Sequence, residues 1–285
     1  MKPRSLSLLF PSSLAIDASD LRSKTAKIGQ IARAASVFRA DKIVIYRDPD
    51  LDETELIERI LNYAETPQYL RKRLFPLAGD LRYAGTIPPL RTPHHPDAEK
   101  IEIGDIRVGV VVRVHENGSW VDIGSKRSAF LNVSMQKGER VNVQVTSNKP
   151  LKAVPVDDDE ITRYWGYSVA RAGSLSRALA PTPTQPPTRT PGLRIATSRC
   201  GESIDVDLLR KIGGESGSEG VLVVFGAPHK GISEIMDEEK IRDGEKSFIA
   251  EFDYTLNVLP DQGTATVRLE EAVVATLAIL NLAFH

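Results

Sequence analysis

Two short segments of the chain place glycine residues directly after an apolar run, where a buried strand would end. The first is Val223–Gly231, VVFGAPHKG, and the second is Asn257–Thr264, NVLPDQGT. In an open α/β sheet, ligands bind beyond the carboxyl ends of the strands. Glycine lets the backbone approach a ligand closely, and exposed N–H and C=O groups can recognise an adenine edge. The segments predict ligand-binding loops, although each taken alone is also an ordinary turn.

Other reactive side chains give weaker signals. His94 and His95 lie between prolines, without a cluster of cysteines or carboxylates around them, so we expect no metal site. Cys200 is the one cysteine of the chain and has no histidine near it in sequence. It cannot form a disulfide within the chain, which favours a reducing compartment.

The elements that would position the two loops alternate between strands and helices. Apolar runs predict strands at 5–10, 42–46, 193–197, 221–225 and 248–252. Helical spacing or capping signals predict helices at 24–38, 52–65, 67–74, 206–212 and 264–282. This alternation predicts an α/β fold with a parallel sheet. The Pro-rich segment 174–192 predicts an irregular surface loop.

The middle of the chain has a different pattern. From Gly104 onward apolar residues alternate with polar ones, and Asn117-Gly118 is a strong hairpin signal. Four strand-like runs, at 106–114, 119–123, 128–133 and 141–145, predict a small barrel. We therefore expect three parts: an α/β part at 1–96, a barrel inserted at 97–160, and an α/β part at 161–285.

Charge and hydropathy limit the classes of protein that fit. The formal net charge of −1 excludes a uniformly basic protein. Segment 1–40 nonetheless has seven Lys or Arg against two acidic residues, and segment 105–152 has eight against four. These positively charged segments could bind a polyanionic partner. Alternatively, their charges are scattered over the solvent-exposed surface without a binding role. The apolar stretch 272–284 is shorter than the roughly 20 residues of a membrane helix. We expect no secretory signal, no membrane span and a cytoplasmic protein.

The order of several motifs resembles one known family. The segment 257–272, NVLPDQGTATVRLEEA, resembles the closing segment of SPOUT (α/β-knot) methyltransferases of the archaeal and eukaryotic branch that carries an inserted OB-fold. Further similar pieces are GQIARA at 29–34, PLRTPHHP at 89–96, YWGY at 164–167 and TSRCG at 197–201. The resemblance covers nearly the whole chain. One departure is Asp261, where the family pattern has glycine.

The resemblance implies a fold, a cofactor and partners. It implies a C-terminal deep trefoil knot, S-adenosylmethionine held by the knot loops, and a homodimer. The activity implied is methylation of a base or ribose in structured RNA, either rRNA or tRNA. The residues that would line the cofactor are Phe225, Gly226, Ala227, Gly231, Asn257, Val258, Leu259, Gln262, Gly263, Thr264 and Val267.

Methyl transfer to a nitrogen that carries a proton also needs a base, or a group that stabilises the developing anion. The catalytic candidates are Arg33, Arg268 and Glu270, each of which has a plain structural alternative as a helix-surface charge. Candidates for RNA contact are basic residues of the two positive segments and Trp120, an aromatic residue that could stack on RNA bases or belong to the barrel core: Arg22, Lys24, Arg107, Arg113, Trp120, Lys126 and Arg127.

Two other classes of function remain open from sequence. In the first, the protein is a non-catalytic RNA-binding dimer in which the knot is only a scaffold. In the second, it is a methyltransferase for small molecules, which the RNA-type barrel argues against. Binding of S-adenosylmethionine separates the first from an enzyme.

Overall fold

The computed structural model describes residues 5–96, 100–180, 192–217, 220–243 and 252–284. The chain forms two compact units. Unit 1 contains Met1–Asn62, Asp80–Pro88 and Tyr167–His285, and unit 2 contains Tyr63–Gly79 and Pro89–Gly166. Unit 2 includes the barrel expected at 97–160 but also takes in parts of the segment expected to belong to the first α/β part.

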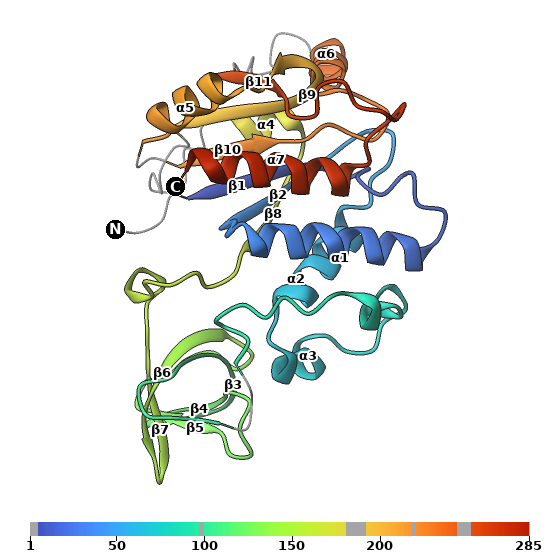
Figure 1. Ribbon diagram of the computed structural model, residues 1–285. Coiled ribbons are helices and arrows are strands. Elements are labelled where there is room, and N and C mark those ends of the chain that lie inside the picture. Colours follow the sequence, from blue (N-terminus) through green and yellow to red (C-terminus); the bar gives the residue numbers. More distant parts are fainter. Residues whose placement is uncertain (1–4, 97–99, 181–191, 218–219, 244–251, 285) are drawn as a thin grey trace. The chain divides into compact units, whose positions relative to one another are not determined.

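Unit 1 is built on a parallel sheet whose strands, among the described residues, have the order β11-β9-β10-β1-β2-β8 (Figure 1). The strands are β1 Leu6–Pro11, β2 Lys42–Tyr46, β8 Ser168–Ala172, β9 Leu193–Ser203, β10 Val221–Val224 and β11 Tyr254–Asn257. The strands β1, β2 and β10 are mostly apolar, as expected for strands that helices cover on both faces of a parallel sheet. The expected α/β fold with a parallel sheet is confirmed.

The helices of unit 1 form two groups. Helices α1 Leu21–Val37, α5 Val206–Glu215 and α7 Leu269–Ala283 pack together, since α7 contacts both of the others. Helix α4 Leu175–Leu179 contacts α6 Ile232–Asp243 on the opposite face. Helix α2 Thr54–Glu65 begins in unit 1 and ends in unit 2, and the short 3-10 helices η1 Gly79–Leu81 and η2 Ala84–Thr86 lie near the boundary.

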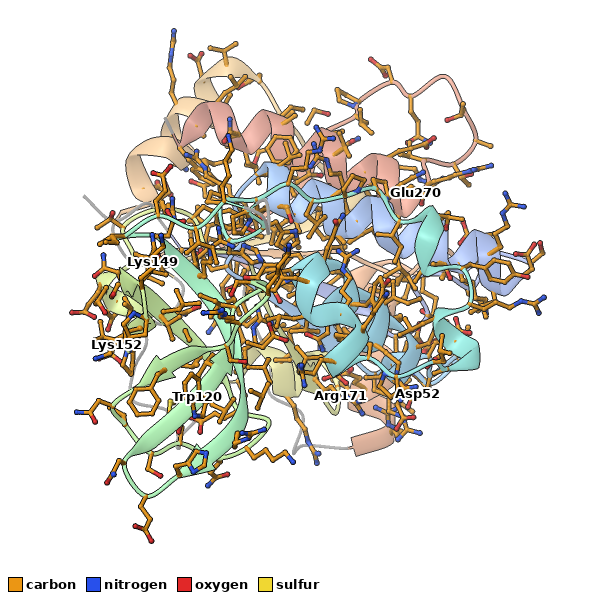
Figure 2. All side chains as sticks on the ribbon, turned by 90° about the horizontal axis from the view of Figure 1, so that it is seen from below. Asp52, Trp120, Lys149, Lys152, Arg171 and Glu270 are labelled. Atoms are coloured by element: carbon orange, nitrogen blue, oxygen red, sulfur yellow. The ribbon has the colours of Figure 1, made fainter. Side chains whose placement is uncertain are left out.

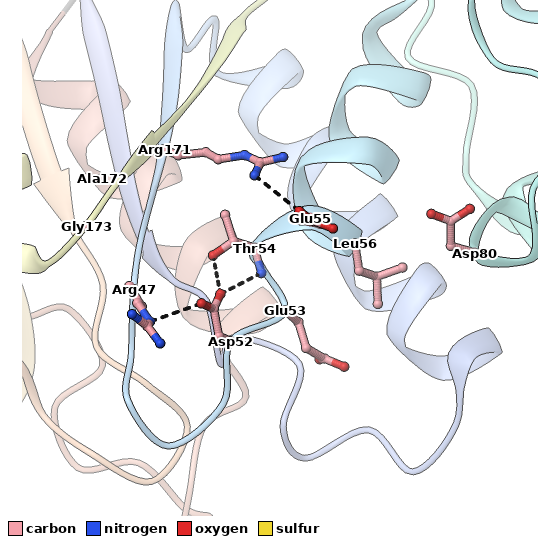
Figure 3. A pocket seen from close by; sticks show the side chains of 10 residues that line it. All are labelled: Arg47, Asp52, Glu53, Thr54, Glu55, Leu56, Asp80, Arg171, Ala172 and Gly173. Carbon is pink, nitrogen blue, oxygen red and sulfur yellow. Dashed lines mark hydrogen bonds and ion pairs between the residues drawn. The ribbon is translucent and has the colours of Figure 1, made fainter.

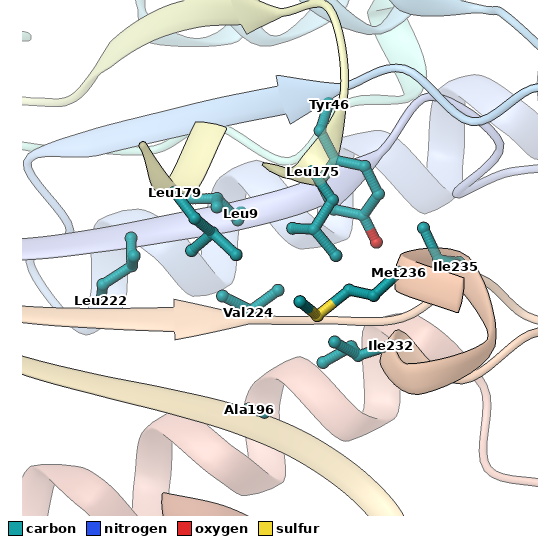
Figure 4. Packing of buried hydrophobic residues seen from close by; sticks show 10 residues of the cluster. All are labelled: Leu9, Tyr46, Leu175, Leu179, Ala196, Leu222, Val224, Ile232, Ile235 and Met236. Carbon is teal, nitrogen blue, oxygen red and sulfur yellow. The ribbon is translucent and has the colours of Figure 1, made fainter. Parts of the chain in front are cut away.

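One hydrophobic cluster shows how the sheet is covered on the α4 and α6 side (Figure 4). It combines strand residues with helix residues: Leu9, Tyr46, Ala196, Leu222, Val224, Leu175, Leu179, Ile232, Ile235 and Met236. Helix α4 lies in the segment 174–192 that was expected to be irregular. Its N-cap Ser174 accepts a hydrogen bond from Arg177 N, and the buried carboxylate of Glu239 accepts from the N–H groups of Leu175 and Ser176. The prediction was wrong there because both caps stabilise a short helix; residues 181–191 lie outside the described residues.

The last helix begins later than the sequence predicts, at Leu269 rather than at residue 264. Gln262 Nε2 donates to the carbonyl of Thr264 at 2.9 Å, and Thr264 Oγ1 donates to the carbonyl of Thr266 at 2.9 Å. Such local side-chain bonds compete with helix formation. The segment therefore stays an extended loop between β11 and α7. The strand expected at 248–252 lies mostly outside the described residues, and β11 follows it.

Unit 2 contains a closed barrel with the strand order β3-β4-β5-β7-β6. The strands are β3 Ile106–His115, β4 Gly118–Asp122, β5 Ala129–Leu131, β6 Arg140–Asn148 and β7 Leu151–Pro155, and η3 Asp158–Glu160 follows them. The expected barrel is confirmed, with β7 as a strand that the sequence analysis did not predict. Its core contains Val111, Val121, Ile123, Ala129, Leu131, Val143, Val145 and Ala153.

The remaining helix of unit 2, α3 Gln68–Leu74, covers the outside of β3. Leu70 packs against Val108 and Val110, and the hydroxyl of Tyr69 donates to the carbonyl of Val108 at 2.8 Å. The first half of β3 therefore has apolar neighbours on both sides. This packing explains why residues 63–79 belong to the same unit as the barrel.

Candidate functional site

The two glycine-containing loops of unit 1 follow the carboxyl ends of two strands of the same sheet. Strand β10 ends at Val224 and β11 ends at Asn257, and both run parallel to β9, which lies between them. With about 4.8 Å between adjacent strands, the two strand ends lie roughly 10 Å apart. The sheet thus brings together two segments that are more than 30 residues apart in sequence, at the edge where α/β proteins bind ligands.

Phe225 anchors the first loop to the core. Its side chain is buried and stacks on Phe10 with ring centroids 5.0 Å apart. Its N–H donates to the carbonyl of Leu9 at 3.0 Å, and its carbonyl accepts from the hydroxyl of Tyr46 at 2.7 Å. The ring was expected to line a cofactor, but it is part of the core beneath the loop.

The rest of the first loop turns tightly. A Cβ atom on Gly226 would lie 2.8 Å from the carbonyl oxygen of Lys230, so only glycine fits this position without movement of the backbone. Gly231 donates its N–H to Glu234 at 2.8 Å, at the start of α6. The side chain of Lys230 forms ion pairs with Asp50 at 2.7 Å and Glu238 at 2.8 Å, and the hydrogen bonds to these two carboxylates raise the pKa of Lys230.

The second loop is held by the side chain of Asn257. Its amide nitrogen donates to the carbonyl of Arg199 at 3.0 Å, and its amide oxygen accepts from the N–H of Leu259 at 3.1 Å. Val258 is buried, whereas Leu259 and Val267 are partly exposed. The apolar side chains expected to face a cofactor thus lie on a loop that the hydrogen bond from Asn257 to Arg199 connects to β9.

The turn of the second loop contains one residue with an unusual backbone conformation. Asp261 has a φ angle of 54°, in the left-handed region that glycine adopts most readily. The resemblance to SPOUT methyltransferases implies glycine at this position, where this chain has Asp. Gly263, two residues later, has open space around it, because an added Cβ would meet no atom within 4 Å.

The catalytic candidates lie on α1 and at the beginning of α7. Glu270 is largely buried, and its carboxylate lies 3.2 Å from the ammonium group of Lys27 on α1. Arg268 precedes α7, is exposed, and donates its backbone N–H to Glu271 at 3.0 Å. Arg33 lies on α1 and is partly exposed. Helices α1 and α7 contact each other.

A separate polar pocket of about 660 Å³ lies at the carboxyl ends of β2 and β8 (Figure 3). Arg47 and Asp52 form an ion pair at 3.1 Å in this pocket, and the hydrogen bond from the hydroxyl of Thr54 lowers the pKa of Asp52. Arg171 lies 3.8 Å from Glu55 (Figure 3). None of the residues predicted to bind the cofactor lines this pocket.

The two basic segments differ in how exposed their charges are. In α1, Arg22 is exposed, whereas Lys24 forms an ion pair with Glu53 at 2.5 Å. In the barrel, Arg113, Trp120, Lys126 and Arg127 are exposed, and Figure 2 shows Trp120 on the barrel.

Arg107 is the exception among the predicted RNA contacts. Its side chain is 1% exposed and donates to the carbonyl of Lys100. As a predicted RNA contact, Arg107 was expected on the outside of the barrel. In the structure Val108 and Val110 pack on Leu70, so Arg107 lies on the opposite face of β3. Arg107 is therefore left out of the RNA-binding surface proposed below.

A buried ionic cluster stabilises unit 2. Both oxygens of Glu65 accept hydrogen bonds from Arg140, at 2.7 and 2.8 Å, and His94 Nε2 lies 3.0 Å from Glu65 Oε1. Burial alone would raise the pKa of Glu65, but hydrogen bonds from His94 and Arg140 and the charge of Arg140 lower it to about 2. Burial and the neighbouring His94 lower the pKa of His95 to about 4.

This cluster gives His94 and His95 a structural role. In the part of the chain that the structure describes, no group of three or more His, Cys, Asp or Glu side chains could hold a metal ion. Tyr46 and Lys27, which support the candidate site, were not among the residues predicted from sequence. Nothing in their local pattern indicates this, because each acts on a residue more than 170 positions away.

Comparison with known proteins adds a family to this geometry. The sequence model of a family described as "Putative RNA methyltransferase" matches residues 5–280. An uncharacterised protein of Halobacterium salinarum is 38% identical over 97% of this chain and 98% of its own length. The human 28S rRNA (uridine-N(3))-methyltransferase is 32% identical over 98% of this chain and 78% of its own length.

The similarity extends to a third lineage. The Drosophila melanogaster 28S rRNA (uridine-N(3))-methyltransferase is 31% identical over 98% of this chain and 62% of its own length.

Within the described ranges, no helix is both long and apolar enough to cross a membrane.

Proposed function

Because the chain belongs to the RNA methyltransferase family whose sequence model matches residues 5–280, we propose that it transfers a methyl group from S-adenosylmethionine to ribosomal RNA. The observation that carries this proposal is the meeting of two glycine-containing loops, after β10 and β11, at one edge of the parallel sheet. The human and fly relatives are methyltransferases for uridine N3. We propose the same atom as the acceptor here, in place of a ribose or a tRNA base.

The residues of the two loops fit this cofactor. Gly263 leaves open space, and the apolar side chains of Val258, Leu259 and Val267 can contact an adenine ring and a methyl group. The proposed contacts are Gly226, Ala227, Gly231, Asn257, Val258, Leu259, Gln262, Gly263, Thr264 and Val267. When bound, S-adenosylmethionine supplies a methyl group that its sulfonium has already activated.

The chain must therefore orient the uracil and deal with the proton on N3. As N3 gains the methyl group it gives up this proton to solvent water, and the negative charge that develops on the uracil needs a cationic neighbour. We assign this role to Arg33 and Arg268. Glu270 is engaged with Lys27, so we propose it as a positioning residue for the first turn of α7.

We further propose that unit 1 is a SPOUT α/β knot and that two copies associate through α7. Exposed apolar residues lie along one stripe of α7, at Val274, Ala278 and Leu282. Val274 is 48% and Leu282 is 71% exposed. A spacing of four residues places them on one helix face, and an exposed apolar face of this kind supports contact with the same face of a second copy.

One experiment separates the enzyme from a non-catalytic RNA-binding dimer. Titration calorimetry measures S-adenosylmethionine binding, and mass spectrometry follows methylation of rRNA fragments that contain unmodified uridine. The expected result is binding together with methylation at N3, and no transfer to a fragment that already carries 3-methyluridine. Absence of cofactor binding would leave the non-catalytic alternative, whereas methylation at another atom would overturn the uridine N3 assignment alone.

A further inference from the structure

Four side chains form a row across the outside of the barrel in unit 2. Trp120 of β4 pairs in register with Arg113 of β3 on one side and with Phe130 of β5 on the other. Phe130 in turn pairs with Lys152 of β7. Directly opposed residues on neighbouring strands project to the same face of a sheet. The row therefore reads Arg113, Trp120, Phe130, Lys152, with one residue from each of four adjacent strands.

The row faces solvent. Residues next to its members along the strands, including Val121, Ala129 and Ala153, are buried in the barrel core, so the row must point outward. Arg113 and Lys152 are exposed, Trp120 is 36% exposed, and Phe130 is partly exposed. Figure 2 shows Trp120 and Lys152 on the barrel.

The two aromatic rings are held in place. Their centroids are 5.2 Å apart at an interplanar angle of 60°. Gly118 leaves room for the second ring, since a Cβ there would lie 2.8 Å from Phe130 Cζ. A larger residue at Gly118 would displace Phe130 from the row. The backbone thus leaves the exposed ring of Trp120 and the partly exposed ring of Phe130 side by side.

Among the residues that the structure describes, no carboxylate forms an ion pair with Arg113 or Lys152. Other cations of the same unit do have partners: Arg73 pairs with Asp122, and Arg140 pairs with Glu65. These two cations flank the two aromatic rings. The row is therefore complementary to a polyanion that carries accessible aromatic rings of its own.

We propose that this row binds an unpaired stretch of RNA, with two adjacent bases on Trp120 and Phe130 and the flanking phosphates on Arg113 and Lys152. The proposal rests on the proposed function in taking RNA as the polyanion. In a duplex the base faces are covered by neighbouring base pairs, and only single strands can offer them to aromatic side chains. The row spans three strand intervals, about 14 Å.

The substrate class follows from this arrangement. The RNA must contain at least two consecutive unpaired nucleotides that contact unit 2, in addition to the uridine that unit 1 would modify. Stacking accepts any base, because every base has a π-face. The row therefore selects single-stranded structure and contributes little to sequence preference.

Fluorescence anisotropy with a labelled uridine-rich single strand, and with the same strand in a duplex, tests the proposal on the full-length protein. The single strand is expected to bind more tightly. Trp120→Leu keeps an apolar side chain but removes the ring, and should raise Kd by about 5- to 150-fold, which corresponds to ~1–3 kcal/mol per stacked base. Trp120→Phe should restore most of the affinity.

The cations are tested by salt dependence. Arg113→Ala and Lys152→Ala should each reduce the slope of log Kd against log salt by about 0.7, the value for one phosphate contact to a single strand. Lys137→Ala is the matched control, because Lys137 is an exposed lysine of the same unit outside the row. It should leave the slope nearly unchanged.

The same variants also separate this inference from the proposed function. Titration with S-adenosylmethionine should give the wild-type affinity in all of them. If cofactor binding is absent but the single-strand preference and its loss in Trp120→Leu remain, the inference stands and the proposed enzyme fails. Wild-type RNA affinity in Trp120→Leu, equal or tighter binding of the duplex, or no RNA binding at all would overturn the inference.

Discussion

The ammonium group of Lys27 lies 2.5 Å from a carboxylate oxygen of Asp17 and 3.2 Å from one of Glu270, although the Lys27 side chain is only 6% exposed. A buried cation with two carboxylate partners fixes the beginning of α7 against α1. The loop that would hold the cofactor ends where α7 begins. Lys27 therefore connects the basic N-terminal helix to the candidate site.

Replacing this lysine should damage the site as well as the fold. In Lys27→Met the carboxylates of Asp17 and Glu270 lose their shared partner, and breaking a buried pair costs about 3–5 kcal/mol. We expect a lower free energy of unfolding in urea and weaker S-adenosylmethionine binding by calorimetry. Lys240→Met, which removes an exposed i,i+3 pair with Asp237, should cost less than about 1 kcal/mol. Equal stability of the two variants would contradict the structural role of Lys27.

Gly263 offers a test of cofactor contact that is free of folding effects. Because an added Cβ would meet no protein atom within 4 Å, Gly263→Val should leave the circular dichroism and the melting temperature nearly unchanged. The same side chain would occupy space assigned to the ligand, so S-adenosylmethionine binding should be lost. Gly214→Ala, another open glycine, on α5, should bind normally. Normal binding by Gly263→Val would remove this loop from the site.

Asp261 should tolerate glycine and reject branched residues. Its left-handed φ of 54° is accessible to Asp and Gly but unfavourable for a β-branched side chain. We expect Asp261→Gly to retain wild-type cofactor affinity. Asp261→Val should lose about 1–2 kcal/mol of stability or weaken cofactor binding correspondingly. Calorimetric titration of both variants checks this, and indistinguishable variants would show that the turn does not need this conformation.

The pair of Glu65 and Arg140 should dominate the stability of unit 2. Glu65→Gln leaves Arg140 without its bidentate partner, and we expect a loss of about 3–5 kcal/mol. Unfolding can be followed by the fluorescence of Trp165, whose indole N–H donates to Asn142 in the same unit. Glu58→Gln removes a more exposed contact with Arg171 and should cost less than about 1 kcal/mol. A similar small effect in both variants would argue against the buried pair as the main support.

Acid should destabilise unit 2 in two steps. The pKa of His95 is lowered from 6.5 to about 4, so between these values the unfolded chain binds a proton that the folded chain does not, and stability falls as pH falls. The pKa of Glu65 is lowered from 4.5 to about 2, so its stabilisation is complete above pH 4.5 and is lost toward pH 2. In His95→Gln, unfolding free energies measured from pH 7 to 4 should show a smaller slope. An unchanged slope would assign the first step to another group.

The sequence predicted the parallel sheet, the barrel and both glycine-containing loops, because each depends on a local pattern. It missed α6, although Ile232, Ile235, Met236 and Glu239 have helical spacing. Glu239 obscures this pattern, since it is a carboxylate buried to accept hydrogen bonds from the beginning of α4. No local rule predicts burial of a charge for a partner more than 60 residues away.

The burial of Arg107 on β3 could not be predicted for a related reason. Strict alternation assumes that one face of a strand is solvated, but α3 covers the first half of β3. The pairing with β4 then shifts between Val111 and Arg113, so that Arg113 faces outward. The same packing explains why unit 2 extends beyond the barrel expected at 97–160. Deleting only that segment would remove Arg140 and leave Glu65 without its main partner.

The position of β1 in the middle of the sheet has a consequence for synthesis on the ribosome. Ser7 can pair early with Lys42 of β2, but its partner on the other side is Leu222 of β10, which is made more than 200 residues later. Until then the nascent sheet has an open, apolar edge, whereas all strands of the barrel have already been translated. We therefore expect the barrel to close first, while the N-terminal strands wait for β10 with one strand edge open to pairing with other chains.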